Sequence, residues 1–384
     1  MRRIGLGFVL IVFAGIAGAL AFAPYLPRLI WEGGPGLTWS DRSHYVDVPG
    51  ANPPMGLVEA MPSAMPNAAL HKLLAEGGGT ALLLMRDGRL VLEYYAPGNG
   101  PETRFNSFSM VKSLVGALVY KAMAEGRIKN LDQTLGTLLP HIPGLKELTL
   151  RRLITMRAGI HFDSRTASFG AAGGAKDSDT FPNPFGPLAR LHFEGVASID
   201  AGLTMDEVAP SVLAYQNVST ALLGEVLEVV YGRPLEQLLS EKLWRPAGAA
   251  TAAWRKPAEG ASVSAYCCLF ATARDWVRVG AYLSNNGTPT APFLPEPMWR
   301  EWFGSGVGLA ERRADHYGNH NLQNVLDRQG QDLQGPFTYF MGQNGQILYL
   351  MPGKGLVAYR AGTTYQFLHS TLYEAWNSAG LPGN

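Results

Sequence analysis

Apolar residues recur at helical spacing in two stretches of the chain. One begins near Ser109, continues through repeated Val, Leu and Met positions, and ends at Gly126. The other follows Asn217 and ends at Gly232, with Pro234 beyond it. Positions three and four residues apart share one helix face, and glycine or proline marks a helix end. The pattern therefore predicts two buried helices.

Short runs of β-type residues lie on both sides of these helices. Thr80–Met85 and Leu90–Tyr95 flank Asp87-Gly88, and an Asp-Gly turn between two such runs is a strong hairpin signal. Three further runs, separated by Gly-rich turns, follow near the end of the chain: Tyr339–Gly342, Gln346–Met351 and Leu356–Ala361. Strands from the two ends of the chain can pair into one sheet.

The order of these elements predicts an α/β (α+β) sheet domain with an inserted helical lobe. We assign residues 56–111 and 245–384 to the sheet domain and residues 112–244 to the lobe. A cleft between the two parts is the expected place for a functional site. A long stretch rich in Gly, Ala, Ser and Pro, from Ser164 to about Pro187, could form part of its rim.

The N-terminal residues form a membrane-directed segment. Arg2 and Arg3 precede an uncharged apolar run, Ile4–Pro24, which is nearly long enough to span a bilayer. We expect residues 1–24 to act as an uncleaved anchor rather than a cleaved signal, and residues 25–55 to be a linker. The positive flank would stay in the cytoplasm, placing the rest of the chain outside it, on the periplasmic side in a bacterium. Cleavage would instead release a secreted protein.

Composition excludes several classes of function. The 384 residues are 47% hydrophobic and 16% charged, with a formal net charge of +1. No run of Lys or Arg could follow a phosphate backbone, so a nucleic-acid partner is not expected. The two cysteines, Cys267 and Cys268, are adjacent, which favours two buried thiols over a disulfide or a metal site. Nothing in the sequence indicates an oligomeric state.

Candidate chemistry begins with Ser109 and Lys112, three residues apart at the start of the first helix. Such residues lie on one face of a helix. A serine hydroxyl is too weakly acidic to attack a carbonyl unaided, but a lysine in apolar surroundings has a lowered pKa and can accept its proton. On this motif alone, a helix N-cap at Ser109 and a solvated Lys112 are the favoured explanation, because S-x-x-K occurs often by chance.

A second candidate pair, Tyr215 and Asn217, lies just ahead of the second helix. Taken alone, Tyr215 could be a packed aromatic residue and Asn217 a helix cap.

Together these motifs resemble the serine β-lactamase and DD-peptidase superfamily, in the class C-like branch that includes esterases and 6-aminohexanoate-dimer hydrolases. Ser109–Lys112 (SMVK) is similar to the S-x-x-K motif, and Tyr215–Asn217 (YQN) is similar to the Y-x-N motif of that branch. Three further stretches also look like the family: Leu153–Ile160, Tyr266–Gly280 and Gly342–Pro352. The resemblance implies an antiparallel sheet flanked by helices, with the helical lobe inserted.

The resemblance also implies an acyl-enzyme mechanism without metal or cofactor. Ser109 would attack an ester or amide carbonyl, and Lys112 and Tyr215 would share its proton. A cationic Lys112 would lower the pKa of the Tyr215 phenol, and which of the two is the base stays open. Asn217 would position substrate or Lys112. The backbone N–H groups of Ser109 and Gln346 would form the oxyanion hole.

One motif departs from the family pattern. Where the superfamily usually has K-T-G, or His or Trp followed by x-G, this chain has Gln343, Asn344 and Gly345. A cation there would help bind a substrate carboxylate, so a neutral glutamine favours neutral esters or amides. The expected substrate-binding residues are Asn217, Gln343, Asn344, Gly345 and Gln346, and the expected partner is a small molecule.

Three alternatives remain open. A β-lactamase or DD-peptidase would use the same serine on anionic substrates. A metalloenzyme would use Asp315, His316 and His320, although Tyr317-Gly318-Asn319 between the histidines indicates a loop and no H-E-x-x-H occurs. A membrane-anchored sensor or binding module would keep the fold without turnover, but the presence of Ser109, Lys112 and Tyr215 argues against it.

Overall fold

The structure of the chain is a computed structural model. It describes residues 13–37, 43–161, 184–205, 212–303, 317–323 and 338–380. Most of the predicted rim loop, residues 164–183, lies outside the described residues, as do Asp315 and His316 of the metalloenzyme alternative.

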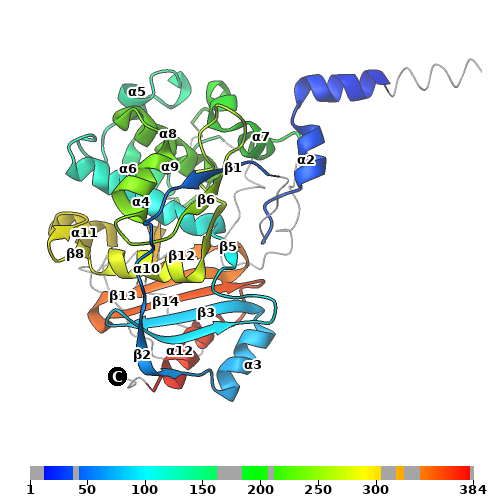
Figure 1. Cartoon of the computed structure of the whole chain (residues 1–384). Helices are drawn as coiled ribbons and strands as arrows, with labels where there is room; N and C mark the ends of the chain where they lie inside the picture. Colours follow the sequence, from blue (N-terminus) through cyan, green and yellow to red (C-terminus); the bar gives the residue numbers. More distant parts are fainter. Residues whose placement is uncertain are drawn as a thin grey trace, which may run out of the picture.

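An eight-stranded sheet forms the lower part of the molecule in Figure 1. In spatial order its strands are β10 (Tyr317–Gly318), β11 (Asn321–Gln323), β12 (Thr338–Gly342), β13 (Gln346–Met351), β14 (Leu356–Gly362), β3 (Gly79–Arg86), β4 (Arg89–Tyr95) and β2 (Val58–Ala64). Neighbours are antiparallel except β2 and β4, which are parallel. Strands β14 and β3 join the two ends of the chain, and β3 and β4 confirm the predicted hairpin.

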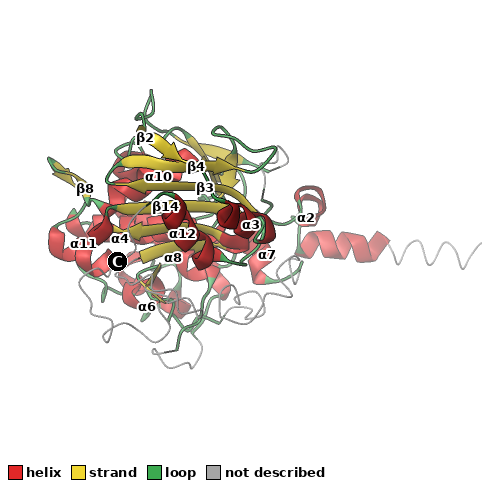
Figure 2. Cartoon of the chain, turned by 90° about the horizontal axis from the view of Figure 1, so that it is seen from below, coloured by secondary structure: helices red, strands yellow, loops and turns green. Residues whose placement is uncertain are grey.

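Helices cover both faces of this sheet. Helices α3 (Ala68–Glu76) and α12 (Leu368–Ser378) pack on one face, in front of the strands in Figure 2, and α10 (Ala273–Ser284) packs on the other. Strand β3 has apolar side chains on both faces of the sheet, so both faces need a covering layer. Leu82 and Leu84 belong to the apolar cluster that includes residues of α3 and α12, and Leu83 and Met85 belong to the main core. Successive side chains of a strand point to opposite faces.

A second sheet of four strands was not predicted from the sequence. Its order is β1 (Tyr45–Val48), β6 (Ala252–Arg255), β7 (Leu269–Thr272) and β5 (Arg104–Asn106). Val46 pairs with Trp254, and Val48 is buried. Residues 25–55 are therefore not a linker throughout, since they contain β1 and helix α2 (Leu26–Glu32). A four-residue strand whose partner is about two hundred residues away leaves too short a pattern to be recognised.

Most of the remaining α-helices lie above the sheet in Figure 1. They are α4 (Val111–Ala124), α5 (Leu135–Leu138), α6 (Leu150–Ile154), α7 (Pro187–Glu194), α8 (Asn217–Tyr231) and α9 (Leu235–Leu239). Helix α11 (Glu296–Phe303) packs against α4, and β8 (Gly287–Thr288) pairs with β9 (Ala291–Pro292). Helices α4 and α8, the two predicted from apolar spacing, contact each other. The domain boundaries assigned from the sequence stay a prediction.

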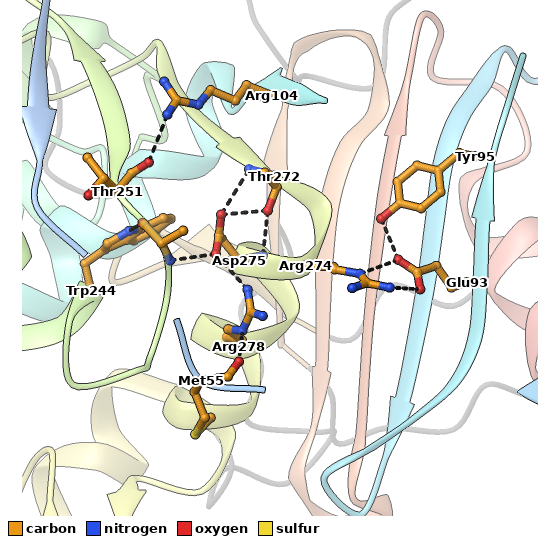
Figure 3. Close-up of polar contacts among 11 residues, drawn as sticks. Met55, Glu93, Tyr95, Arg104, Trp244, Thr251, Thr272, Arg274, Asp275 and Arg278 are labelled. Carbon is orange, nitrogen blue, oxygen red and sulfur yellow. Dashed lines mark hydrogen bonds and ion pairs between the residues drawn. The ribbon is translucent and has the colours of Figure 1, made fainter. Parts of the chain in front are cut away.

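Helix α10 is fixed at its N-terminus by a buried carboxylate (Figure 3). Thr272 and Asp275 form a capping box. Asp275 Oδ1 also accepts hydrogen bonds from the backbone N–H of Ala250 at 2.8 Å and from Arg278 at 2.9 Å. The neighbouring Arg274 forms two hydrogen bonds of 2.7 Å with Glu93 on β4. These contacts tie α10 to the large sheet and to the chain before β6.

Asp275→Ala should lower the free energy of unfolding by about 3–5 kcal/mol, because it removes the cap of α10 and leaves Arg278 buried without a carboxylate. Urea unfolding measures the loss. Asp132→Ala is the control, since its ion pair with Arg151 is exposed and should contribute little. Equal losses in the two variants would contradict the role given to Asp275.

In the described N-terminal part, a helix covers Phe13–Phe22 and is followed by α2. Among the described residues, no one helix has the length and apolar character to cross a bilayer, and these two satisfy that test only as a pair bent by 87°. Helix α2 is attached to the body of the protein. Glu32 forms a buried ion pair of 3.1 Å with Arg255, and the rings of Tyr25 and Phe193 stack.

The two cysteines correct the sequence prediction. Cys267 and Cys268 are joined as a disulfide between neighbouring residues, where two separate thiols were expected. Cys268 has a positive φ of 70°, a backbone conformation that residue types alone do not disclose. Both residues are buried, as predicted, and directly precede β7.

Candidate functional site

A strained turn places Ser109 at the start of α4. The preceding residue, Phe108, has a φ of 42°, which costs free energy for a bulky side chain. Asn106 Oδ1 accepts the Phe108 backbone N–H at 2.8 Å and holds the turn. The end of β12 lies against it, since a Cβ on Gly342 would come within 2.2 Å of the Ser107 carbonyl oxygen. Ser109 is left half-buried, on the 3₁₀ turn Phe108–Met110.

Lys112 is buried beside the serine, with 1% of its surface exposed. Its Nζ donates hydrogen bonds to Ser109 Oγ at 2.9 Å and to the Tyr266 carbonyl oxygen at 2.7 Å. Nζ also lies 5.0 Å from the centre of the Tyr215 ring. Burial lowers the pKa of Lys112 well below its ordinary range. No carboxylate of the described residues forms an ion pair with it, so the neutral amine is favoured, as the sequence predicts.

Tyr215 completes the cluster and corrects one expectation. Its side chain interacts with Ser109, and its ring packs edge-on against Tyr317, with centroids 5.8 Å apart. Burial raises the pKa of the Tyr215 phenol above its ordinary range, whereas a cationic Lys112 was expected to lower it. Burial explains both pKa shifts, because it disfavours charged groups. It disfavours the Tyr215 phenolate, and it also disfavours the Lys112 ammonium that would have stabilised that phenolate.

Asn217 is buried and is the first residue of α8. No hydrogen bond joins it to Ser109 or Lys112, both of which are described, so its positioning role stays a prediction. The residue before it holds the segment in place, because Gln216 donates a hydrogen bond to the Ile160 carbonyl oxygen at 2.9 Å.

The predicted substrate-binding turn, Gln343–Gly345, connects β12 and β13. Asn344 has a φ of 62° and Gly345 a φ of 76°; a Cβ on the glycine would lie 2.2 Å from the Thr364 carbonyl oxygen. The backbone N–H of Gln346 donates to the Gln343 carbonyl, and would have to leave it to bind a substrate oxygen. Its part in an oxyanion hole therefore stays a prediction.

The Ser109 backbone N–H, unlike that of Gln346, is not engaged in a hydrogen bond with the described residues. The N–H groups of its neighbours Phe108 and Met110 are bonded to Asn106 Oδ1 and the Ser107 carbonyl. The start of α4 also carries the positive end of the helix dipole. This N–H remains the better placed of the two predicted oxyanion donors.

A cation lies close behind the turn but is not accessible to solvent. Arg360 on β14 is 1% exposed and donates to the carbonyl oxygens of Gly345, at 2.7 Å, and of Gly77. Burial lowers the pKa of Arg360 to about 10. Gln343, by contrast, is half-buried and neutral. The turn therefore presents no positive side chain of its own to a bound carboxylate.

Two tyrosines of the site escaped the sequence reasoning. Tyr266 supplies the carbonyl that orients Lys112, and its ring lies 5.7 Å from Lys112 Nζ. Tyr365 interacts electrostatically with Tyr215 and with the backbone of Asn344. Tyr266 is the first residue of a stretch that resembles the family, and this resemblance could have identified it from the sequence. Nothing in the local pattern marks Tyr365.

His320 serves the core rather than a metal ion. Its Nδ1 lies 2.8 Å from the Ile154 carbonyl oxygen and its Nε2 3.0 Å from Thr220 Oγ1. Burial lowers the pKa of His320 to about 3. Because both ring nitrogens are engaged, the metalloenzyme alternative built on this residue is not supported.

Comparisons with known proteins agree with this architecture. The family model described as Beta-lactamase matches residues 67–362. A protein of Bacillus subtilis assigned as the penicillin-binding protein PbpX is 24% identical over 204 residues, which are 50% of this chain and 46% of that protein. The chain thus matches about half the length of this relative.

Solved structures extend the likeness over most of the chain. A protein of Bacillus anthracis assigned as a 6-aminohexanoate-dimer hydrolase has a TM-score of 0.69 at 20% identity, covering 89% of this chain and 92% of its own. EstCE1, described as a hydrolase with promiscuous acyltransferase activity, has a TM-score of 0.58 at 17% identity, covering 81% and 98%. At these identities the likeness shows the fold.

Proposed function

The chain belongs to the beta-lactamase family, and from this premise we propose that it is a serine hydrolase that cleaves an ester or amide bond through an acyl-enzyme on Ser109. One observation carries the proposal. The Nζ of a buried Lys112 lies 2.9 Å from Ser109 Oγ, without an ion-pair partner among the described residues. A neutral amine in that place has a lone pair available for the serine proton.

In the proposed first step, Ser109 Oγ attacks the carbonyl carbon and its proton passes to Lys112 Nζ. The Ser109 N–H stabilises the oxyanion that forms. Tyr215, which burial keeps protonated, donates its proton to the departing oxygen or nitrogen and regains one from the Lys112 ammonium. Water then attacks the acyl-enzyme by the same route in reverse, releasing the acid and restoring Ser109.

A fluorophosphonate probe with a chromogenic short-chain ester tests the proposal. A hydrolase of this kind is labelled at Ser109 and turns over the ester. A binding module that has kept the fold does neither, and that result would overturn the proposal.

The preferred substrates are proposed to be neutral esters or uncharged amides. The support is the neutral Gln343 at the turn and the burial of Arg360, the cation that contacts the turn from behind. A β-lactamase or DD-peptidase is the second candidate, because one relative is assigned as a penicillin-binding protein. The two candidates share Ser109 and differ in how a substrate carboxylate is bound.

Gln343→Lys should shift the ratio of kcat/KM toward carboxylate-bearing β-lactams by on the order of tenfold to a hundredfold. A well-placed charged hydrogen bond contributes roughly 1.5–3 kcal/mol. Kinetics with p-nitrophenyl esters, a linear aminohexanoate amide and nitrocefin measure the ratio. Gln237→Lys on α9 is the matched control, because it adds the same charge at an exposed position. Efficient nitrocefin hydrolysis by the unmodified protein, with poor ester turnover, would instead favour the β-lactamase.

We further propose that the N-terminal segment holds the protein at a membrane with its catalytic part outside the cytoplasm. The support is the apolar run behind Arg2 and Arg3, together with the exposed side chains of Phe13 and Trp31. Cell fractionation with an alkaline carbonate wash tests this, since an anchored protein stays in the membrane pellet. Complete release by the wash would contradict an anchor.

A further inference from the structure

Three side chains with metal-binding atoms meet within the helical part of the molecule. His141 follows α5, Asp200 begins the 3₁₀ turn Asp200–Gly202, and Glu225 lies in the middle of α8. His141 Nε2 is 2.8 Å from Glu225 Oε1 and 3.6 Å from Asp200 Oδ2. One potential ligand atom from each residue lies within 4.8 Å of the other two. The three residues are distant in sequence and meet only through folding.

The carboxylates of this cluster are buried and incompletely satisfied. The Asp200 side chain is 7% exposed and that of Glu225 is 15% exposed. Asp200 Oδ1 and Glu225 Oε2 are both buried without a hydrogen-bond partner among the described residues. Burial raises the pKa of Asp200 to about 6, and burial with the Asp200 charge raises the pKa of Glu225. Two buried carboxylates side by side favour a positive charge between them, which a protonated His141 or a metal ion would supply.

We propose that His141, Asp200 and Glu225 bind a zinc-class divalent cation. Ligand atoms about 2.0–2.2 Å from a tetrahedral Zn²⁺ lie roughly 3.3 Å from one another, between the two distances that separate the histidine nitrogen from its carboxylate neighbours. An imidazole with two carboxylates suits zinc, whereas Ca²⁺ and Mg²⁺ prefer sets made of oxygen alone. Water would complete the coordination.

Access to the site is from the side of His141, whose side chain is 50% exposed. The ion would connect the chain after α5 and the turn at Asp200 to α8. Glu225 comes eight residues after Asn217, which corresponds to about 12 Å along the helix, so the ion would not take part in the chemistry at Ser109. Its expected effect is on the stability of the helical part.

The experiment uses the full chain, purified in mild detergent with an affinity tag that contains no histidine and then dialysed against EDTA. Calorimetric titration with ZnCl₂ should show one site per chain, and zinc at about 100 times the dissociation constant should raise Tm by a few degrees. Co²⁺ in its place should give the visible absorption bands of a tetrahedral site.

Glu225→Gln and His141→Ala should each weaken Zn²⁺ binding by on the order of 100-fold. The second variant alters a half-exposed side chain and tests the proposal even if the first does not fold. His71→Ala is the control, since it removes an exposed histidine of α3. Absence of zinc binding in the unmodified chain, or equal affinity in His141→Ala and His71→Ala, would overturn the proposal.

Discussion

Ser109→Ala should reduce hydrolysis of p-nitrophenyl esters by on the order of 10⁶-fold and abolish labelling by a fluorophosphonate. The change removes the atom that would form the acyl-enzyme. Only one oxygen is lost from a half-buried side chain, so the fold should persist. Steady-state kinetics measure the activity and circular dichroism the fold.

Ser113→Ala is the matched control for this variant. Ser113 lies one turn further along α4, and its hydroxyl is buried and donates to the His320 carbonyl oxygen instead of facing Lys112. Its loss should cost stability by about 1 kcal/mol and leave the chemistry intact. If Ser113→Ala were the inactive variant and Ser109→Ala remained active, the nucleophile assigned here would be wrong.

The features that the sequence predicted correctly depend mostly on neighbours in the chain. The spacing of Ser109 and Lys112 on a helix, and the hairpin about Asp87-Gly88, need no information beyond a few residues. The resemblance to the β-lactamase superfamily and the fold it implied are confirmed by the family match and by the solved structures. The order of the family-like motifs along the chain indicated how distant segments are arranged, which local patterns cannot do.

The features that were missed depend on contacts between distant segments. Strand β1 is defined by its pairing with β6, and Tyr365, which interacts electrostatically with Tyr215, lies in the segment after β14. The direction of the Tyr215 pKa shift was wrong because the sequence shows which charges are near but not how deeply they are buried. The cluster around Glu225 combines both difficulties, since its partners are distant and its carboxylates are buried.

Lys112→Met should reduce kcat/KM for esters by about 10³-fold to 10⁴-fold or more, because it removes the proposed base while filling nearly the same volume. Ester kinetics provide the measurement. Lys121→Met, on the same helix, is the control, because that lysine donates to the Phe293 carbonyl oxygen and lies near Glu125. The two lysine variants differ in their distance from Ser109, so comparable losses would contradict a base at Lys112.

The double variant Ser109→Ala, Lys112→Met should be little worse than either single variant. Ser109 and Lys112 act in the same proton transfer, so removing either one already abolishes that step. The factors by which the two single variants lose activity therefore do not multiply in the double variant. A loss equal to the product of the two would show that Ser109 and Lys112 do not act as a pair.

Lys112→Met should also make the protein more stable near neutral pH. Burial lowers the folded-state pKa of Lys112 below the ordinary value of 10.5, so between the lowered pKa and 10.5 the unfolded chain binds more protons than the folded one. The free energy of unfolding of the unmodified protein must therefore rise with pH across that window. Methionine does not titrate, so the free energy of unfolding of the Lys112→Met variant lacks this pH dependence. The difference in stability between the variant and the unmodified protein should therefore shrink toward pH 10.5, and urea unfolding at several pH values measures it. An advantage independent of pH would mean that Lys112 stays protonated in the folded protein, and it could then not be the base.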